Sequence, residues 1–151
     1  MFESFLKIDG IPGESTDAAH KDWIDVTGWD YASDLGNQGA QVAARPNLRD
    51  LLVAKRLDRA SPLLFRALNN SQRFATVELE AVDSDDRRRF IRVILKNAVI
   101  TNARLHAGPD TEQRPTESLA FGYASIEWIY TLPPNPDGTP GADVSALLSR
   151  R

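Results

Sequence analysis

Apolar and polar residues alternate one by one along much of this chain, and this pattern restricts its fold more than any other feature. The clearest stretch is 74–82, whose apolar residues on one face are Ala75, Val77, Leu79 and Ala81. The opposite face carries Thr76, Glu78 and Glu80. A period of two is typical of β-strands with one face in a core and the other in water. The chain is therefore expected to be mainly β, with antiparallel pairing.

Further strands are expected wherever this alternation returns between turn-forming residues. They cover residues 2–8, 21–31, 48–56, 87–95 and 117–131, and the run 98–101 is expected to continue as extended structure. The acidic turn at 83–86 joins two of these strands into a hairpin, and its acids are expected to neutralise the basic run 87–89. Within 21–31 the apolar residues change from one face of the expected strand to the other, and Gly28 favours a β-bulge at that point.

One short helix is expected to begin at Ser61. The Ser61 hydroxyl can cap the first turn, and Pro62 suits the first helical position, where a missing N–H costs nothing. Leu64, Phe65 and Leu68 form an apolar stripe with helical spacing. The residues alone thus predict a barrel or sandwich of antiparallel strands with a single helix.

The length of 151 residues fits a single domain that can bury a substantial core. The composition changes near the C-terminus, where six of the nine residues from 133 to 141 are Pro or Gly. We expect a β-domain over residues 1–132. A Pro/Gly-rich tail over residues 133–151 should follow it, flexible or docked at the periphery.

The residue types that usually carry chemistry form no recognisable constellation. The chain has no cysteine, and His20 and His106 are expected to be surface or capping residues instead of zinc ligands. Gly13 and Ser15 begin a pattern like a nucleophile elbow, but Asp17 stands where that motif needs glycine. We therefore predict no catalytic, metal-binding or cofactor-binding residues.

Charge and the N-terminal residues limit the partners and the location. A net charge of −3 argues against duplex nucleic acid, whose binding proteins normally carry a basic excess. No apolar run reaches the ~18 residues that a membrane helix needs. Glu3, Lys7 and Asp9 interrupt the apolar stretch that a secretory signal would require. We expect synthesis in the cytoplasm, and export would need a route that accepts folded protein.

Several stretches, in order along the chain, resemble the Hcp (haemolysin-coregulated protein) family, the tube subunit of the bacterial type VI secretion system. The first is 5–17, with the sequence FLKIDGIPGESTD, followed by residues 20–26. The others are 57–64, 93–100 and 117–130. Each stretch is short, but their shared order and spacing cover residues 2–132.

The resemblance implies an antiparallel two-sheet β-barrel flanked by one short helix, over residues 1–132. It also implies a homohexameric ring, stacking of rings into a tube, a spike protein at the tip, a contractile sheath, and small effectors in the lumen. Such a subunit is structural, and it is secreted without a signal peptide. A tail-tube-like subunit of another contractile injection machine, as in phages, shares the fold. A carbohydrate-binding or hydrolytic β-domain that uses the tryptophans is a more remote alternative.

Two candidate surfaces follow from this resemblance. Asp30 lies between Trp29 and Tyr31, whose bulk should enter the core, so alternation directs Asp30 out of the core. The matching position of the family lines the channel, and Asp30 is therefore assigned to the lumen. The long loop 32–47 is expected to contact the next subunit or ring, through Asp34, Leu35, Asn37, Gln38 and Gln41.

Overall fold

The computed structural model describes residues 1–35, 46–110 and 113–150, and within them the chain is mainly antiparallel β with one helix, as predicted. The first strands are β1 (Phe2–Ile8), β2 (Ile24–Val26), β3 (Gly28–Asp30) and β4 (Ser33–Asp34). β5 (Asn47–Leu48) and β6 (Leu51–Arg56) precede the helix α1 (Ser61–Asn69). β7 (Arg73–Asp83), β8 (Arg89–His106), β9 (Thr116–Gly122), β10 (Ser125–Thr131) and β11 (Asp143–Ser149) follow it.

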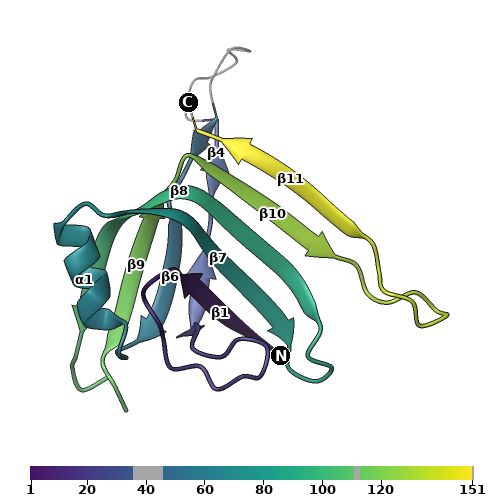
Figure 1. Cartoon of the computed structure of the whole chain (residues 1–151), viewed down its shortest axis with the longest axis horizontal. Helices are drawn as coiled ribbons and strands as arrows, with labels where there is room; N and C mark the ends of the chain where they lie inside the picture. The colour runs from purple at the N-terminus through teal and green to yellow at the C-terminus, as the bar shows by residue number, and fades with distance from the viewer. Residues whose placement is uncertain (36–45, 111–112, 151) are drawn as a thin grey trace.

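Nine strands of the described part of the chain form one curled sheet, and β4 and β5 pair with each other as a separate two-stranded sheet (Figure 1). The order of the curled sheet is β2-β1-β7-β8-β9-β6-β3, with β10 and β11 attached beside β8. The end strands β2 and β3 are separated only by Thr27, whose N–H donates to the Ala54 carbonyl of β6 at 2.8 Å. The chain therefore links the two ends of the curled sheet at this corner. Both walls of the predicted barrel belong to this single sheet.

Apolar side chains from the large strands and from α1 fill the barrel. Those with no exposed surface include Leu6, Ile24, Leu51, Leu64, Val93, Leu95, Phe121 and Ile126. They follow the alternation seen in the sequence, since Leu6 of β1 faces Leu79 of β7, which in turn faces Val93 of β8. Cross-strand rows of this kind place one face of each strand in a common core.

The change of parity in the segment 21–31 has a different cause from the predicted bulge. The chain runs through two short strands, β2 and β3, and Thr27 separates them. β2 pairs with β1, whereas β3 pairs with β6, so the chain turns a barrel corner there. Similarly, the predicted strand 117–131 is two strands, β9 and β10. The ladder is interrupted at Tyr123, whose hydroxyl donates to the Arg49 carbonyl at 2.6 Å.

Helix α1 begins at the predicted residue, but its cap and its buried face differ from the prediction. Its N-cap residue is Ala60, without a side-chain cap, because the Ser61 hydroxyl lies in a buried polar network instead. Leu64 is fully buried against the sheet. Phe65 lies about 100° further round the helix and is only half-buried, so it is not part of the packed core.

The tail predicted to be flexible or peripherally docked contains a regular strand. β11 pairs antiparallel with β10 over seven residues, from Asp143 opposite Thr131 to Ser149 opposite Ser125 (Figure 1, yellow). Arg150 then donates to the Leu48 carbonyl, from Nη2 at 2.6 Å. The segment is thus docked by a hydrogen-bonded ladder, yet it stays outside the core because most of its side chains are exposed.

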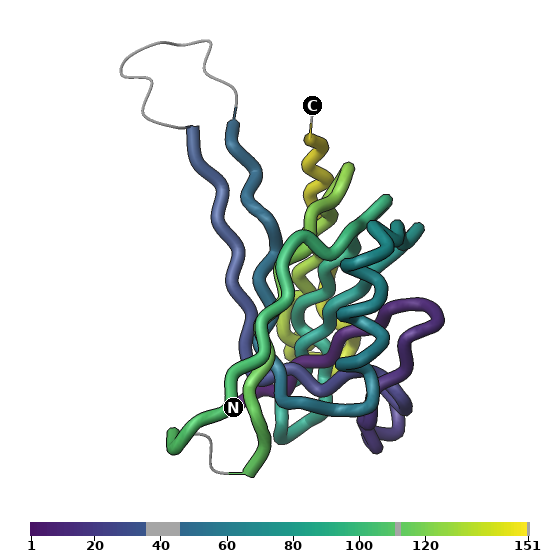
Figure 2. The backbone as a smooth tube through the Cα atoms, turned by 90° about the vertical axis from the view of Figure 1, so that its left-hand side faces the viewer, coloured from purple at the N-terminus to yellow at the C-terminus, as the bar shows by residue number. Residues whose placement is uncertain are grey.

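A long hairpin extends from one side of the barrel (Figure 2). Its two arms contain β3 and β4 on one side and β5 and β6 on the other, and Ser33 of β4 faces Leu48 of β5. The predicted loop 32–47 is therefore partly strand at its base. Its middle, 36–45, lies outside the described residues.

Candidate functional site

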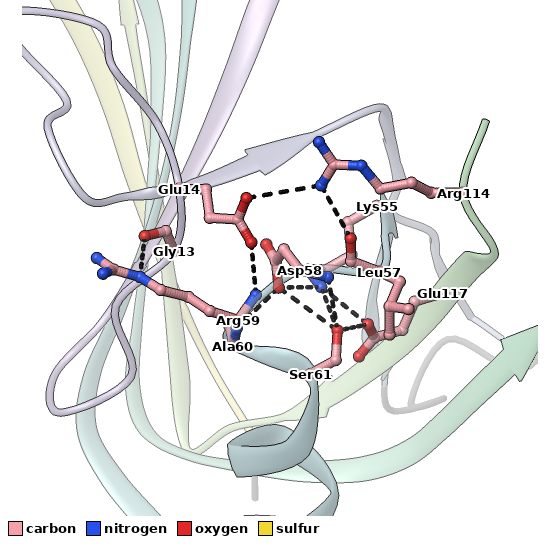
Figure 3. A network of polar contacts seen from close by, with 10 residues as sticks. All are labelled: Gly13, Glu14, Lys55, Leu57, Asp58, Arg59, Ala60, Ser61, Arg114 and Glu117. Atoms are coloured by element: carbon pink, nitrogen blue, oxygen red, sulfur yellow. Dashed lines mark hydrogen bonds and ion pairs between the residues drawn. The ribbon is translucent and has the colours of Figure 1, made fainter.

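A buried ionic network centres on Lys55 of β6, whose side chain is fully buried (Figure 3). Its ammonium group donates to Glu117 Oε2 at 2.8 Å, to Asp58 Oδ1 at 2.8 Å and to Ser61 Oγ at 3.1 Å. The Ser61 hydroxyl also donates to Glu117 Oε2, at 2.5 Å. All three ammonium protons are thereby used, and none is available for chemistry. The network fastens the start of α1 to β6 and β9.

A second layer of contacts links this network to the N-terminal loop (Figure 3). Glu14 accepts a hydrogen bond from the Arg59 N–H at 2.7 Å and lies 3.6 Å from the Arg114 guanidinium. Nearby, the pKa of Asp25 is raised although this residue is exposed, because partial removal of water disfavours its charged carboxylate and the negative charge of Asp58 adds to the effect. A pocket of about 210 Å³ lies beside these residues. Acids and arginines both border it, so its charge is of mixed sign.

The second buried ionic cluster contains His20, which was wrongly predicted to be a surface or capping residue. Its ring has only 4% of its surface exposed. Nδ1 lies 2.7 Å from Asp17 Oδ2, Nε2 lies 2.8 Å from Glu80 Oε1, and the ring stacks on Phe5. The hydrogen bond from His20 holds the pKa of Asp17 below its ordinary value. His20 thus attaches the N-terminal loop to β7.

Arg87 contacts this cluster from the solvent side. The prediction that the basic run 87–89 pairs with the acids of its own turn is therefore wrong for Arg87. Instead of pairing with the acids of its own hairpin turn, its guanidinium contacts Glu3 of β1 and Asp17 of the N-terminal loop. Arg89 pairs with Glu80. The backbone of Arg87 has a positive φ of 59°, so the chain turns there and directs the side chain back over β1.

The side chains of the two buried clusters are not arranged as a metal centre. Among the described residues, no group of three His, Cys, Asp or Glu side chains is placed to hold a metal ion. In the same part of the chain, no helix has the length and apolarity to cross a bilayer.

One exposed face of the barrel consists mostly of small side chains. We call it the small-residue wall and define it as the outward face of β3, β6, β9 and residues 100–106 of β8. Register places Asp30, Leu52, Ala120 and Asn102 in one row across these strands. Gly28, Ala54, Ser118 and Arg104 form the next row. A shallow hollow of about 490 Å³ lies on this wall, and the only charged residue that lines it is Asp30.

Asp30 points out of the core, in agreement with the alternation argument. Trp29 and Tyr31 turn inward, with ring centroids 6.2 and 4.9 Å from that of Trp128. Asp30 itself is exposed and lies opposite Leu52, which is 46% exposed. Its assignment to a lumen stays a prediction, because that role depends on an assembly.

Two of the five loop residues predicted to contact another subunit are described, Asp34 and Leu35, and both lie at the end of one hairpin arm. Asp34 is in β4, and its carboxylate lies 3.0 Å from the Arg49 guanidinium. Leu35 is 60% exposed. Asn37, Gln38 and Gln41 lie outside the described residues, and the contact role of all five stays a prediction.

Several strand edges lack a partner strand among the described residues, and three of them matter here. β3 pairs only with β6, β8 beyond Val99 pairs only with β9, and β11 pairs only with β10. β11 also exposes apolar side chains on both faces, with Val144 59% and Leu147 64% exposed. Unpaired edges of this kind are templates for strand addition.

Sequence reasoning missed the last part of β8 and all of β11, and hence two of these edges. Extended structure was expected only as far as Thr101, whereas β8 continues to His106. Apolar residues do alternate in β11, at Val144, Ala146 and Leu148, and this pattern was the available indication.

The barrel with a projecting hairpin can be compared with known proteins. Residues 5–130 match a family model described as "Type VI secretion system effector, Hcp". The chain belongs to the Hcp family. This confirms the resemblance found in the sequence. The Hcp protein hcp1 of Pseudomonas aeruginosa is 26% identical over 142 residues, which cover 90% of this chain and 86% of that protein.

Solved structures agree with the Hcp assignment. A structure described as a type six secretion system protein superposes with a TM-score of 0.88 at 28% identity, covering 99% of this chain and 96% of the other. Hcp1 from Salmonella typhimurium has the same fold, with a TM-score of 0.84 at 21% identity over 98% of this chain and 94% of that one. The chain is thus an Hcp protein in sequence and in fold.

Proposed function

We propose that this Hcp protein is the structural subunit of a type VI secretion tube. Six copies form a ring, rings stack into a tube behind a spike protein, and a contractile sheath drives the tube out of the cell. The subunit is made in the cytoplasm and leaves by this route. The observation that carries the proposal is the small-residue wall, which has an unpaired strand at each side.

These two edges are complementary in direction. Neighbouring strands are antiparallel throughout the order β3, β6, β9, β8, so β3 and β8 run in opposite directions. The free edge of β8 in one copy can therefore take β3 of the next copy as a further antiparallel strand. Repetition of one such head-to-tail contact generates a closed ring when the rotation between copies is right.

The chemistry of the wall suits the inner surface of such a ring. Gly28, Ala54, Ser118 and Ala120 present little apolar area, and Asn102 adds a neutral polar group. A passenger effector would then meet a surface that retains it only weakly. Asp30 belongs to this face, which supports its assignment to the lumen.

Native mass spectrometry of the purified full chain tests the ring. The expected species has six times the 16.7 kDa subunit mass, and negative-stain electron microscopy should show rings with an open centre. A protein that remains monomeric across micromolar concentrations, with no rings on the grid, would refute the proposal.

The long hairpin is proposed to contact the next ring. Deletion of residues 36–44 should leave the barrel folded, as judged by circular dichroism, and should leave six-membered rings in the mass spectrum. Stacked tubes should become rare, because the deletion removes three of the predicted contact residues, Asn37, Gln38 and Gln41. Unchanged tube length after this deletion would exclude the loop from stacking.

A further inference from the structure

Two exposed charges of opposite sign lie on the small-residue wall without partners. Asp30 is in β3 and Arg104 is in the last part of β8. Within residues 1–35, 46–110 and 113–150, neither side chain takes part in a hydrogen bond or an ion pair. By contrast, Arg150 binds Asp50 at 2.7 Å and Arg49 binds Asp34 at 3.0 Å.

The register shows that the two charges share one face. Asp30 faces Leu52, which faces Ala120, which faces Asn102. Arg104 is two residues after Asn102 on β8, and residues two apart on a strand point to the same side. Asp30 and Arg104 therefore project from the same wall, in neighbouring rows.

Their positions prevent them from pairing within one chain. β3 and β8 are the first and last of the four strands of the wall, with β6 and β9 between them. At about 4.8 Å per strand, three spacings separate the two backbones by roughly 14 Å. Each charge lies instead beside a free strand edge, where a second copy can approach.

We propose that Arg104 of one copy forms an ion pair with Asp30 of the next copy across the seam of the ring. The inference rests on the proposed function, and it adds the pair of residues that selects the contact. When β8 and β3 of two copies pair, opposite residues lie about 5 Å apart and diagonal ones about 7–8 Å apart. An arginine side chain spans either distance.

This pair also explains how the chain avoids a symmetric contact. If two β3 edges met each other, two Asp30 carboxylates would face one another, and two β8 edges would likewise bring two Arg104 guanidinium groups together. Like charges opposite one another are destabilising, whereas the head-to-tail contact joins opposite charges. The charges thus favour the orientation that closes a ring.

A charge-swap experiment tests the pair with four full-length proteins: the unchanged chain, Asp30→Arg, Arg104→Asp, and the double swap. Ring fraction is measured by native mass spectrometry over a concentration series in low salt. Each single swap replaces attraction by repulsion, and the concentration for half-assembly should rise at least about fivefold. The double swap restores opposite charges and should return to within about twofold of the unchanged chain.

Arg66→Asp is the control, because Arg66 is an exposed arginine on α1, outside the four strands of the wall. This variant should assemble like the unchanged chain, and circular dichroism should show all variants folded. Single swaps that assemble normally, or a double swap as weak as the singles, would overturn the ion pair while leaving the ring intact. An unchanged chain that forms no rings would overturn the ring and the pair together.

Discussion

Replacement of Lys55 by methionine should destabilise the folded subunit by about 3–5 kcal/mol, the usual cost of removing one partner from a buried ion pair. The substitution leaves Glu117, which is fully buried, with only the Ser61 hydroxyl as a donor. Asp58 keeps the Ala60 N–H at 2.9 Å. Two buried carboxylates would then lie close together without a cation between them. For a chain of this size the melting temperature should fall by roughly 6–20 °C.

Urea unfolding at one fixed protein concentration, followed by tryptophan fluorescence, measures this loss. Lys21→Met is the control, because Lys21 is exposed and its replacement should change stability by no more than about 0.5 kcal/mol. The double variant Lys55→Met with Glu117→Leu should recover much of the loss, since apolar side chains can replace a buried ion pair at little cost. A single-variant loss below about 1 kcal/mol, or a double variant no more stable than the single one, would show that the network is not a coupled ion pair.

Three further substitutions test other parts of the structure. Leu64→Ala should cost about 2–5 kcal/mol in chemical denaturation, because Leu64 is fully buried between α1 and the sheet; a loss near zero would contradict that packing. Asp25→Asn should stabilise the protein near pH 7, because the raised pKa of Asp25 makes its ionisation unfavourable in the folded state. The gain should vanish near pH 3, where the carboxyl is protonated in folded and unfolded chains alike, and a gain equal at both pH values would disprove this cause. Gly13→Ala should lower the melting temperature strongly, since a Cβ there would lie 2.4 Å from the Trp23 carbonyl oxygen, whereas Gly28→Ala, with no atom within 4 Å, should change it little; equal effects would refute the steric reasoning.

Local patterns in the sequence predict the regular parts of the barrel well. β1, β7 and the start of α1 appear where alternation and the Pro62 position place them, because each depends on residues close together in the chain. The corner at Thr27 was predicted only as a bulge. Its actual cause, the exchange of β1 for β6 as the pairing partner, depends on residues far apart in sequence.

Buried charges were the least predictable part of the site. Lys55 lies in a strand with alternating burial, and only the distant Glu117 makes its inward position tolerable. His20 is likewise buried because Glu80, sixty residues away, accepts from its ring. Asp30 was placed outside the core correctly, since alternation with Trp29 and Tyr31 is a local property. The prediction of β11 failed because the Pro/Gly-rich stretch before it suggested that regular structure had ended.

The length of β8 has a mechanical consequence. This one strand of 18 residues pairs with β7 and β10 along its first part and with β9 along its last part. At about 3.4 Å per residue its contour is roughly 60 Å long, and the covalent chain is continuous from one end to the other. A pull along β8 loads its whole ladder in shear, and many hydrogen bonds must yield at once instead of one after another. A subunit built around such a strand resists stretching along that direction far better than one assembled from short strands joined by loops.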